Sequence, residues 1–299
     1  MGNKKNITII INPISGIGRQ KTIESLLPSA LDHLKFNYSI VYTQYAGHAH
    51  ELARQAVEEK KDIVMIAGGD GSVNEAGSAL VHSETALAIL PAGSGNGLAR
   101  HLKIPLQVKK AIALLNNHST KKIDTGIVNE HRFMGVAGVG FDAHIAHVFD
   151  KDGKRGFRTY AKLVLREYRK YHPSTYELAI NGREEKREAL MITIANSSQF
   201  GNGAKMAPKA VIDDGIFTVV STSKYPISRL PGVLLKLMTG RIKPGRYISM
   251  AETENLVIKG FEGWMHLDGE PRFIPKTDLK FGLESKSLKV IVPVNQPRN

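Results

Sequence analysis

The chain of 299 residues contains no cysteine. Disulfides and thiolate metal sites are therefore excluded, and a reducing compartment is the natural expectation. Long apolar runs are also missing, because no stretch approaches the roughly 18–20 uncharged residues that a membrane span needs. The apolar run that follows the N-terminal MGNKKN is too short for a secretory signal. From these absences we expect a cytoplasmic protein without a spanning helix.

Acidic residues are scarce relative to basic ones. The chain carries 28 Asp and Glu against 41 Lys and Arg, which gives a formal net charge of +13. This excess favours an anionic partner, such as nucleic acid, an anionic membrane surface or a phosphorylated small molecule. The sequence has no clustered aromatic platform, zinc-finger pattern or RNP-like motif, so we expect no nucleic-acid partner. A basic nucleic-acid-binding protein stays open as the non-enzymatic alternative.

Apolar strand patterns alternate with helical patterns over roughly the first 115 residues. The predicted strands are 7–13, 38–43, 62–68 and 86–91, and the predicted helices are 19–34, 48–60 and 74–81, with further helix after residue 97. This alternation is typical of a doubly wound α/β domain, in which a parallel sheet carries helices on its faces. The loops that follow the strands of such a sheet converge on one edge.

The pattern changes after about residue 122. Short alternating runs separated by Gly, Asn and Asp predict an all-β domain, with helices near 155–171 and 227–239. Asn181-Gly182 predicts a tight hairpin. We therefore expect one domain over residues 1–125 and a second over 126–299, and leave open that the C-terminal residues pack back on the first domain.

Three glycine-rich loops follow separate strands of the predicted parallel sheet. They are NPISGIGRQ (12–20), GGDGSVNE (68–75) and PAGSGNGLAR (91–100). Glycines let the backbone turn sharply and approach a ligand, and successive amides in such turns form an anion-binding concavity. A helix that begins near Asn74 would add its positive N-terminal end. Together the loops predict a phosphate-binding site.

Two acidic residues in the second loop have alternative interpretations. A carboxylate repels phosphate, so Asp70 either acts through an intervening Mg²⁺ or orders the loop itself. Glu75 either caps a neighbouring segment or binds a ribose. No loop contains GxxxxGK[ST], and none places GxGxxG after the first strand, so neither a Walker P-loop nor a standard dinucleotide site is expected.

At this point the sequence resembles the diacylglycerol kinase catalytic domain family, which includes sphingosine, ceramide and bacterial lipid kinases and shares GGDG with NAD kinases. The motifs that carry the resemblance are, in order, NPISG (12–16), Thr43 with GHA (47–49), GGDGSVNE (68–75), PAGSGNGLAR (91–100), MAPKAVIDDGIFTVV (206–220) and HLDGE (266–270). The resemblance implies an NAD kinase-like nucleotide-binding domain and a C-terminal β-sandwich, with the active site in the cleft. It also implies an ATP-dependent lipid kinase that uses Mg²⁺.

The resemblance also implies roles for individual residues. Nucleotide contacts are expected from Asn12, Ser15, Gly16, Thr43, Gly69, Asp70, Gly71, Ser72, Asn74, Glu75 and Ser94, and we add Pro13, Gly68, Gly95 and Asn96 as members of the same loops. Asp268 and Glu270 match the acidic pair to which the proton-accepting role is assigned. Asp214 matches a carboxylate that holds a structural Mg²⁺ beside the carbonyls of Val211 and Ile216, and Asp124 matches another acidic position.

Departures from the family pattern leave the acceptor lipid open. Gly97 stands where many bacterial diacylglycerol kinases carry Asp, which is more similar to sphingosine and ceramide kinases. We therefore keep three alternatives: diacylglycerol as acceptor, a sphingoid base or ceramide, and a soluble substrate as in an NAD kinase. The basic segments 151–170 and 227–246 are candidates for peripheral docking on an anionic membrane. A homodimer also stays open.

Overall fold

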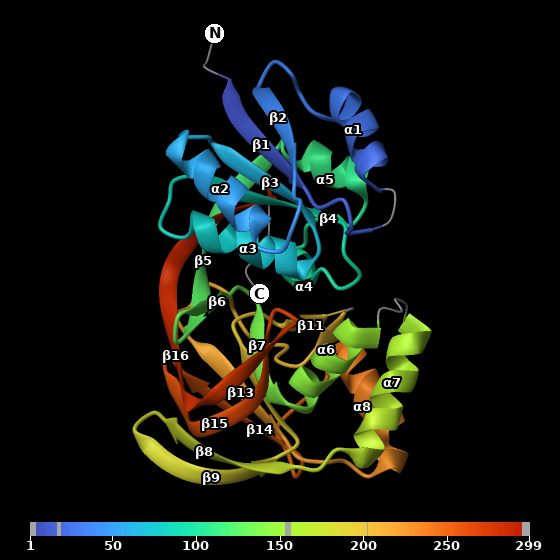
Figure 1. Cartoon of the computed structure of the whole chain (residues 1–299), viewed down its shortest axis with the longest axis vertical. Helices are drawn as coiled ribbons and strands as arrows, with labels where there is room; N and C mark the ends of the chain where they lie inside the picture. Colours follow the sequence, from blue (N-terminus) through green and yellow to red (C-terminus); the bar gives the residue numbers. More distant parts are fainter. Residues whose placement is uncertain (1–3, 17–18, 153–156, 202, 295–299) are drawn as a thin grey trace. The chain divides into compact units, whose positions relative to one another are not determined.

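The structure, a computed structural model, describes residues 4–16, 19–152, 157–201 and 203–294. Contacts between residues divide the chain into two compact units. Unit 1 contains Met1–Thr125, Gly201–Gly203 and Ser285–Asn299, and unit 2 contains Gly126–Phe200 and Ala204–Glu284. In Figure 1 the colours follow the chain from one unit into the other.

Unit 1 contains a parallel sheet in the order β4-β3-β1-β2. Its strands are β1 (Lys5–Ile11), β2 (Phe36–Tyr42), β3 (Ile63–Gly68) and β4 (Ala86–Pro91). Every residue of β3 and β4 is buried, which explains why both strands read as continuous apolar runs. The end of β16 (Glu270–Pro293) joins the sheet in parallel to β4, through Val290 and Leu87.

Five helices of unit 1 accompany this sheet among the described residues. They are α1 (Arg19–Ala30), α2 (His48–Glu58), α3 (Asp70–Leu80), α4 (Gly97–His101) and α5 (Val108–Leu114). The prediction of a helix over 19–34 was too long, because α1 ends at Ala30 and Asp32 then accepts a turn hydrogen bond from the amide of Leu34. Pro28 lies inside α1 without ending it. Helices α2 and α3 pack against each other.

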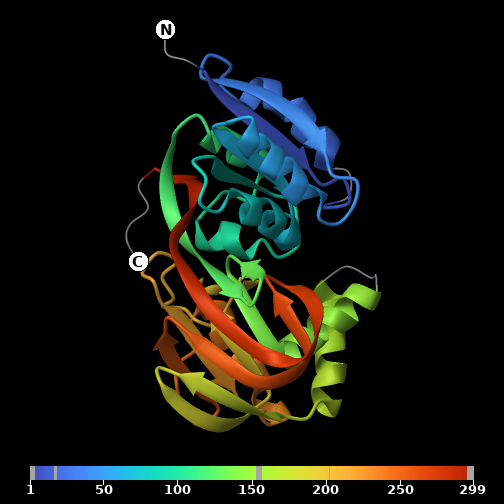
Figure 2. The same ribbon diagram turned by 60° about the vertical axis from the view of Figure 1, so that its left-hand side comes forward.

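Unit 2 is an antiparallel β-sandwich, so the predicted fold class of an α/β domain followed by an all-β sandwich is confirmed. Neighbouring strands run in the order β14-β13-β10-β7-β15-β16. They are β7 (Val136–Gly140), β10 (Met191–Ala195), β13 (Phe217–Thr222), β14 (Ile248–Thr253) and β15 (Leu256–Leu267), with β8 (Ser174–Ile180), β9 (Arg183–Ala189), β11 (Gln199–Gly201) and β12 (Ala204–Lys205) beside or near them. Figure 2 shows the twist of the β15–β16 ribbon.

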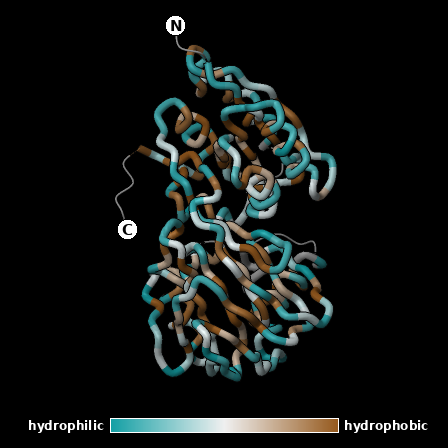
Figure 3. The backbone as a smooth tube through the Cα atoms, turned by 90° about the vertical axis from the view of Figure 1, so that its left-hand side faces the viewer, coloured by the Kyte–Doolittle hydropathy of each residue, from teal (hydrophilic) through white to brown (hydrophobic). Residues whose placement is uncertain are grey.

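Aromatic side chains lie at the centre of the unit 2 core. Phe133 and Phe217 are fully buried and stack with ring centroids 5.6 Å apart. Phe133 comes from β6 (His131–Phe133), which forms a hairpin with the end of β5 (His118–Val128). Hydrophobic residues recur along the strands of both units in Figure 3. Burial of these side chains supplies the main stabilisation of each unit.

The Asn181-Gly182 hairpin is confirmed. Ile180 pairs with Arg183 at the end of β8 and β9, and both turn residues have positive φ, 51° and 73°. These are the backbone angles of a type I′ turn, for which Asn-Gly is the preferred pair.

The helices of unit 2 include one that the sequence analysis missed. The predicted helices near 155–171 and 227–239 are present as α7 (Phe157–Lys170) and as a 3₁₀ turn, η1 (Ile227–Arg229), that continues into α8 (Leu230–Thr239). Helix α6 (Phe141–Asp152) was hidden because it begins at the residue after β7, with only the left-handed Gly140 (φ 97°) to turn the chain. No helix in the described part of the chain is both long and apolar enough to cross a bilayer.

Candidate active site

The second glycine loop continues directly into helix α3. The prediction that this helix begins near Asn74 was wrong, because α3 begins at Asp70 after an extended Gly69, and the amide of Val73 donates to the carbonyl of Gly69. The amides of the GGDG motif therefore belong to the helix N-terminus itself, where the positive end of the dipole lies.

Asp70 ties the second loop to the third. Its Oδ1 accepts a hydrogen bond of 2.7 Å from the amide of Gly97. A Cβ atom on Gly95 would lie 2.7 Å from Oδ2, so a larger residue there would displace the Asp70 carboxylate from this position. Of the two interpretations of Asp70, this geometry supports the one in which the carboxylate orders the loops.

The first loop is joined to α3 by side chains. Asn12 Nδ2 donates to the hydroxyl of Ser72 over 2.9 Å, and Asn12 Oδ1 accepts from the amide of Ile14 over 3.0 Å. Ser15 follows with its amide bonded to the Asn12 carbonyl, and Gly16 has a positive φ of 65°. Because β1, β3 and β4 are parallel neighbours, their three loops meet at one edge of the sheet.

The second and third loops approach each other at their glycines. A Cβ atom on Gly93 would lie only 2.5 Å from the Cα of Gly69, so no larger residue fits without moving backbone. Asn96, in the left-handed conformation (φ 54°), closes the third loop by bonding both the amide and the carbonyl of Gly93. Ser94, at the tip of this loop, is exposed.

Glu75, in α3, caps the preceding helix, α2. Its Oε1 accepts from the amide of Gly47 over 2.9 Å, and its Oε2 accepts from the amide of Ala49 over 3.2 Å. These amides lie at the N-terminus of α2, where an anionic acceptor is favourable. The capping interpretation of Glu75 is therefore the one with contacts in the structure. Thr43, half-buried at the end of β2, donates its amide to the carbonyl of Ile11.

The remaining predicted nucleotide residues belong to the same edge of unit 1. Asn74 lies one helical turn before Ser78, whose hydroxyl donates to the Asn74 amide oxygen over 3.5 Å. Pro13 follows Asn12 in the first loop, and Gly68 closes β3 before the second. The structure thus brings the predicted residues of the three glycine loops together, whereas the nucleotide contacts themselves stay a prediction.

Asp268 is held by a row of backbone amides in unit 2. Its Oδ1 accepts from the amides of Gly135 (2.7 Å) and Val136 (2.9 Å), and its Oδ2 accepts from that of Met134 (2.7 Å). Asp268 also has a positive φ of 50° in the tight turn between β15 and β16. Three amide donors fix both carboxylate oxygens in one orientation. Glu270, which follows the turn, is exposed.

A buried pair beneath this turn was missed by sequence reasoning. His266 Nε2 and Asp142 Oδ2 are 3.2 Å apart, and both side chains are 4% exposed. The amide of Gly269 donates to His266 Nδ1 over 3.3 Å, so the hydrogen-bond pattern places the ring proton on Nε2, facing Asp142. Thr193 contributes a further hydroxyl to Asp142 over 3.4 Å. His266 stands inside the HLDGE motif, but nothing near Asp142 in the sequence indicates this contact.

The predicted metal residues lie in both units. In unit 2, Asp214 is exposed and its Oδ1 accepts from the amide of Ile216 over 3.1 Å, in the same loop as Val211. In unit 1, Asp124 is fully buried and accepts from the amide of Lys286 over 2.6 Å. The described residues contain no group of three or more His, Asp or Glu that could hold a metal. A single carboxylate is still compatible with Mg²⁺, which takes few protein ligands and keeps several waters.

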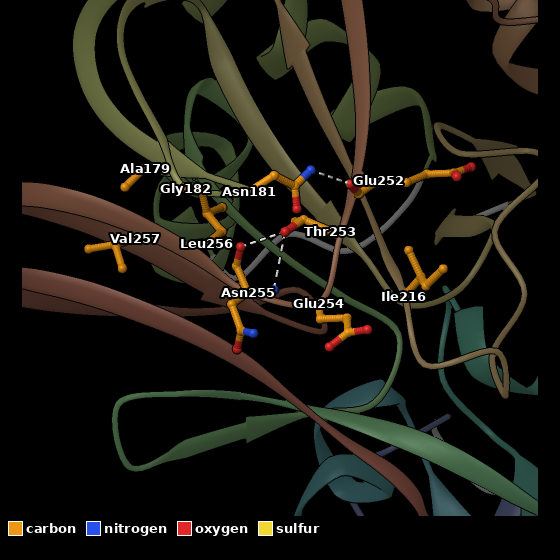
Figure 4. A pocket seen from close by; sticks show the side chains of 10 residues that line it. All are labelled: Ala179, Asn181, Gly182, Ile216, Glu252, Thr253, Glu254, Asn255, Leu256 and Val257. Atoms are coloured by element: carbon orange, nitrogen blue, oxygen red, sulfur yellow. Dashed lines mark hydrogen bonds between the residues drawn. The ribbon is translucent and has the colours of Figure 1, made fainter.

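A shallow pocket of about 440 Å³ lies elsewhere in unit 2. Figure 4 shows its walls, formed by Ala179, Asn181, Gly182, Ile216, Glu252, Thr253, Glu254, Asn255, Leu256 and Val257. Ile216 is the one predicted site residue among them. This pocket contains none of the three glycine loops and neither Asp268 nor Asp214, and its size alone is no reason to prefer it as the site of chemistry.

Comparisons with known proteins connect these features to a family. Residues 6–128 match the family described as "Diacylglycerol kinase catalytic domain", and residues 135–292 match "YegS C-terminal NAD kinase beta sandwich-like domain". A "Probable lipid kinase YegS-like" protein of Pseudomonas aeruginosa (strain UCBPP-PA14) is 30% identical over 84% of this chain and 83% of its own. A "Diacylglycerol kinase" of Staphylococcus carnosus is 23% identical over 89% of each chain.

A solved structure has the same fold. The crystal structure of a diacylglycerol kinase from Bacillus anthracis aligns with a TM-score of 0.75 over 98% of each chain, at 19% sequence identity. The matched segments include the three glycine loops, the Asp268 turn and the Asp214 loop. From its two matched domains and its relatives, the chain belongs to the diacylglycerol kinase catalytic domain family and is a lipid kinase.

Proposed function

We propose that the protein transfers the γ-phosphoryl group of ATP to the hydroxyl group of a lipid such as diacylglycerol. The observation that carries the proposal is the interlocked set of glycine loops at the N-terminus of α3. Oriented amides at a helix N-terminus form a preorganised site for phosphate. The anchoring of Asp70 and Asn12 keeps those amides in place before a ligand arrives. Loops that are preorganised in this way favour a nucleoside triphosphate as the ligand.

Phosphoryl transfer depends mainly on positioning and on charge stabilisation. The lipid hydroxyl oxygen forms a bond to the γ-phosphorus, the bond from that phosphorus to the β–γ bridging oxygen breaks, and ADP leaves. The amides of Asp70, Gly71 and Ser72 stabilise the phosphate oxygens. The exposed Ser94 hydroxyl is available to the nucleotide from the third loop.

The proton of the lipid hydroxyl goes to a carboxylate, and we assign this role to Asp268. Its three amide partners hold the carboxylate in a fixed orientation while the side chain stays partly exposed. In a loose transition state the proton moves late, so a carboxylate of ordinary basicity is sufficient. Glu270 lies on the exposed side of the same turn and is the alternative acceptor.

Magnesium fits the residues present in two places. The first is Asp70, which also accepts the Gly97 amide and is the carboxylate nearest in sequence to the phosphate-binding amides. The second is Asp214, which together with the carbonyls of Val211 and Ile216 would offer hard oxygen ligands to a structural ion. When bound with a nucleotide, Mg²⁺ neutralises charge on the phosphate oxygens.

Labelled ATP tests the proposal. The protein is incubated with γ-labelled ATP, Mg²⁺ and mixed micelles that contain diacylglycerol, ceramide or a sphingoid base, with NAD as a soluble acceptor. We expect label in the diacylglycerol product, phosphatidic acid. Label in ceramide or the sphingoid base would support lipid kinase activity but with a different acceptor lipid. Label in NAD alone would contradict a lipid acceptor, and no labelled product would contradict the proposal as a whole.

Two variants test the assignment of Asp268. Asp268→Asn preserves the side-chain shape and should lower kcat by about 10²–10⁴-fold, the usual contribution of a general base. Glu270→Gln should retain most of its turnover. Glu262→Gln, at an exposed carboxylate on β15, the strand that leads into the Asp268 turn, is the matched control and should behave as the parent. A larger loss of kcat in Glu270→Gln than in Asp268→Asn would indicate that Glu270 is the proton acceptor.

A further inference from the structure

Helix α8 exposes large apolar side chains. Leu234, Leu235 and Met238 are 53%, 65% and 46% exposed, and Ile227 in the preceding turn is 48% exposed. No residue of α8 is buried. Isolated exposed leucines are common on protein surfaces, but a row of them on one short helix marks an interaction site.

The opposite side of α8 is packed, so its exposure does not come from a detached helix. Val233 and Leu237 contact the core cluster that includes Met206 and Ile248. Leu230 packs against a second cluster. The helix therefore has an apolar inner side that holds it in unit 2 and an apolar outer side that faces solvent. In Figure 1 it lies with α6 and α7 at one side of the unit 2 sheet.

Two tyrosines support the base of α8. The Tyr168 hydroxyl donates to the carbonyl of Tyr225 and accepts from the Tyr225 amide, at 2.9 and 2.7 Å. Burial raises the pKa of both tyrosines, which keeps these hydroxyl groups neutral. Tyr225 also stacks on Tyr247, with ring centroids 4.6 Å apart. The outer side of α8 is thus presented by a fixed scaffold.

The segment that carries the exposed side is rich in basic residues and lacks acidic ones. Residues 215–251 contain no Asp or Glu. The exposed cations are Arg229, Lys236, Arg241, Lys243 and Arg246. In the described part of the chain, none of them forms an ion pair. Arg229 and Arg246 lie over the ring of Tyr247, 5.5 and 5.6 Å from its centroid.

From these observations we infer that η1 and α8 form a docking surface for an anionic phospholipid bilayer. Apolar side chains at the centre and cations around them are the two components of an interfacial helix. The leucines would enter the boundary between headgroups and acyl chains, and the arginines and lysines would contact lipid phosphates. The inference rests on the proposed function, because a lipid kinase without a spanning helix in its described part must reach its acceptor in the bilayer.

Of the two basic segments that the sequence analysis singled out, only 227–246 carries this inference. The other segment, 151–170, includes residues 153–156, which lie outside the described residues. Charge complementarity favours an anionic bilayer over a second copy of this chain, because a dimer formed through this surface would place like charges opposite each other.

Vesicle flotation tests the docking surface. Vesicles of phosphatidylglycerol and phosphatidylcholine are compared with vesicles of phosphatidylcholine alone. We expect the parent protein to bind the anionic vesicles and to be released by salt. The variant Leu234→Ser/Leu235→Ser should bind at least tenfold more weakly, and Arg241→Gln/Lys243→Gln should lose about tenfold on anionic vesicles. Matched controls in unit 1, Leu34→Ser for the first variant and Lys109→Gln/Lys110→Gln for the second, should bind as the parent.

Kinase assays separate this inference from the proposed function. A short-chain diacylglycerol dispersed in water needs no docking, so Leu234→Ser/Leu235→Ser should phosphorylate it at the parent rate and lose activity only on vesicles. Equal vesicle binding by parent and variant would overturn the docking surface, even in an active kinase. Dimerisation of the parent that disappears in the variant, without vesicle binding, would also overturn it. Vesicle binding by a parent that phosphorylates no lipid would retain the docking surface and reject the kinase proposal.

Discussion

In unit 1, Asp70 and Glu75 accept backbone amides that lie 27 and 26–28 residues away in sequence. In unit 2, Asp268 accepts three consecutive amides of one segment, and the turn beneath it is supported by the buried pair of His266 and Asp142. The loops of unit 1 thus depend on one another through close backbone contacts. The carboxylate of unit 2 depends instead on a buried polar network.

This difference determines which change damages each site. Added volume should damage unit 1, because a Cβ atom on Gly93 would collide with the backbone of Gly69. Loss of one polar partner should damage unit 2, because the remaining buried groups would then lack hydrogen bonds. Trp264, the single tryptophan, lies in β15 and stacks on His147, so its fluorescence reports on unit 2 alone.

In unit 1 the largest effect is expected for Gly93→Ala. The new Cβ would lie 2.5 Å from Gly69 Cα, so the second and third loops must separate. A displacement of about 1 Å in a preorganised site costs roughly 100-fold in rate, and we expect kcat/KM for ATP to fall by about this factor. Steady-state kinetics and direct nucleotide binding would measure the loss.

Gly245→Ala is the matched control for this variant. Nothing lies within 4 Å of a Cβ at Gly245, so its kinetics should equal those of the parent. The fluorescence of Trp264 should be unchanged in both variants. Normal nucleotide binding by Gly93→Ala would show that the loop contact is not needed for the site.

Asp142→Ala should produce the largest change in unit 2. It leaves the Nε2–H of His266 and the hydroxyl of Thr193 without their common acceptor in a site that is 4% exposed. A buried donor without a partner costs about 2 kcal/mol, and we expect the free energy of unfolding to fall by that amount. Urea unfolding followed by Trp264 fluorescence would measure it. Glu262→Ala, which removes an exposed carboxylate, should change this value by less than about 0.5 kcal/mol.

Much of the fold could be predicted from local sequence patterns. Strands β3 and β4 of unit 1 are buried on both faces and therefore appear as apolar runs, and Asn181-Gly182 specifies its turn by backbone angles that other residues disfavour. The start of α3 was misjudged because Gly69, Asp70 and Gly71 have low helix propensity. The helix nevertheless begins at Asp70, where the positive end of the helix dipole favours a carboxylate.

The roles of individual acids were harder to predict. Sequence reasoning identified Asp70 and Glu75 but left two roles open for each, because a carboxylate that binds amides and one that faces a ligand occur in similar motifs. The choice depends on Gly97 and Gly47, which belong to other loops. The contact between Asp142 and His266 spans 124 residues, and nothing in local spacing predicts a contact of that range.

A smaller effect is expected for Glu75→Gln. The neutral amide can accept from Gly47 or Ala49 but not from both, so the cap on α2 weakens by about 1 kcal/mol. Faster hydrogen exchange of the first α2 amides, with an almost unchanged KM for ATP, is the expected result. Glu58→Gln, at the exposed end of α2, is the control. A raised KM with unchanged exchange would instead favour a ribose contact for Glu75.

The smallest expected effect is a pH dependence in unit 1. Burial lowers the pKa of His118 below its ordinary value of 6.5, a direction that nearby Lys5 and Lys35 reinforce and a hydrogen bond to the carbonyl of Leu115 partly offsets. The unfolded chain therefore binds a proton at a higher pH than the folded chain does. The contribution of His118 to stability is complete above pH 6.5 and declines as the pH falls below it.

Replacement by asparagine isolates this contribution. His118→Asn should make the stability of unit 1 less sensitive to pH between about 7.5 and 5.5, measured by hydrogen exchange of the β1 and β3 amides. His33→Asn, an exposed histidine in the same unit, should keep the slope of the parent. Burial also lowers the pKa of His131 in unit 2, so a pH dependence should persist in Trp264 fluorescence when His118 is replaced. An unchanged slope in the exchange of unit 1 amides would show that protonation of His118 is not linked to folding of that unit.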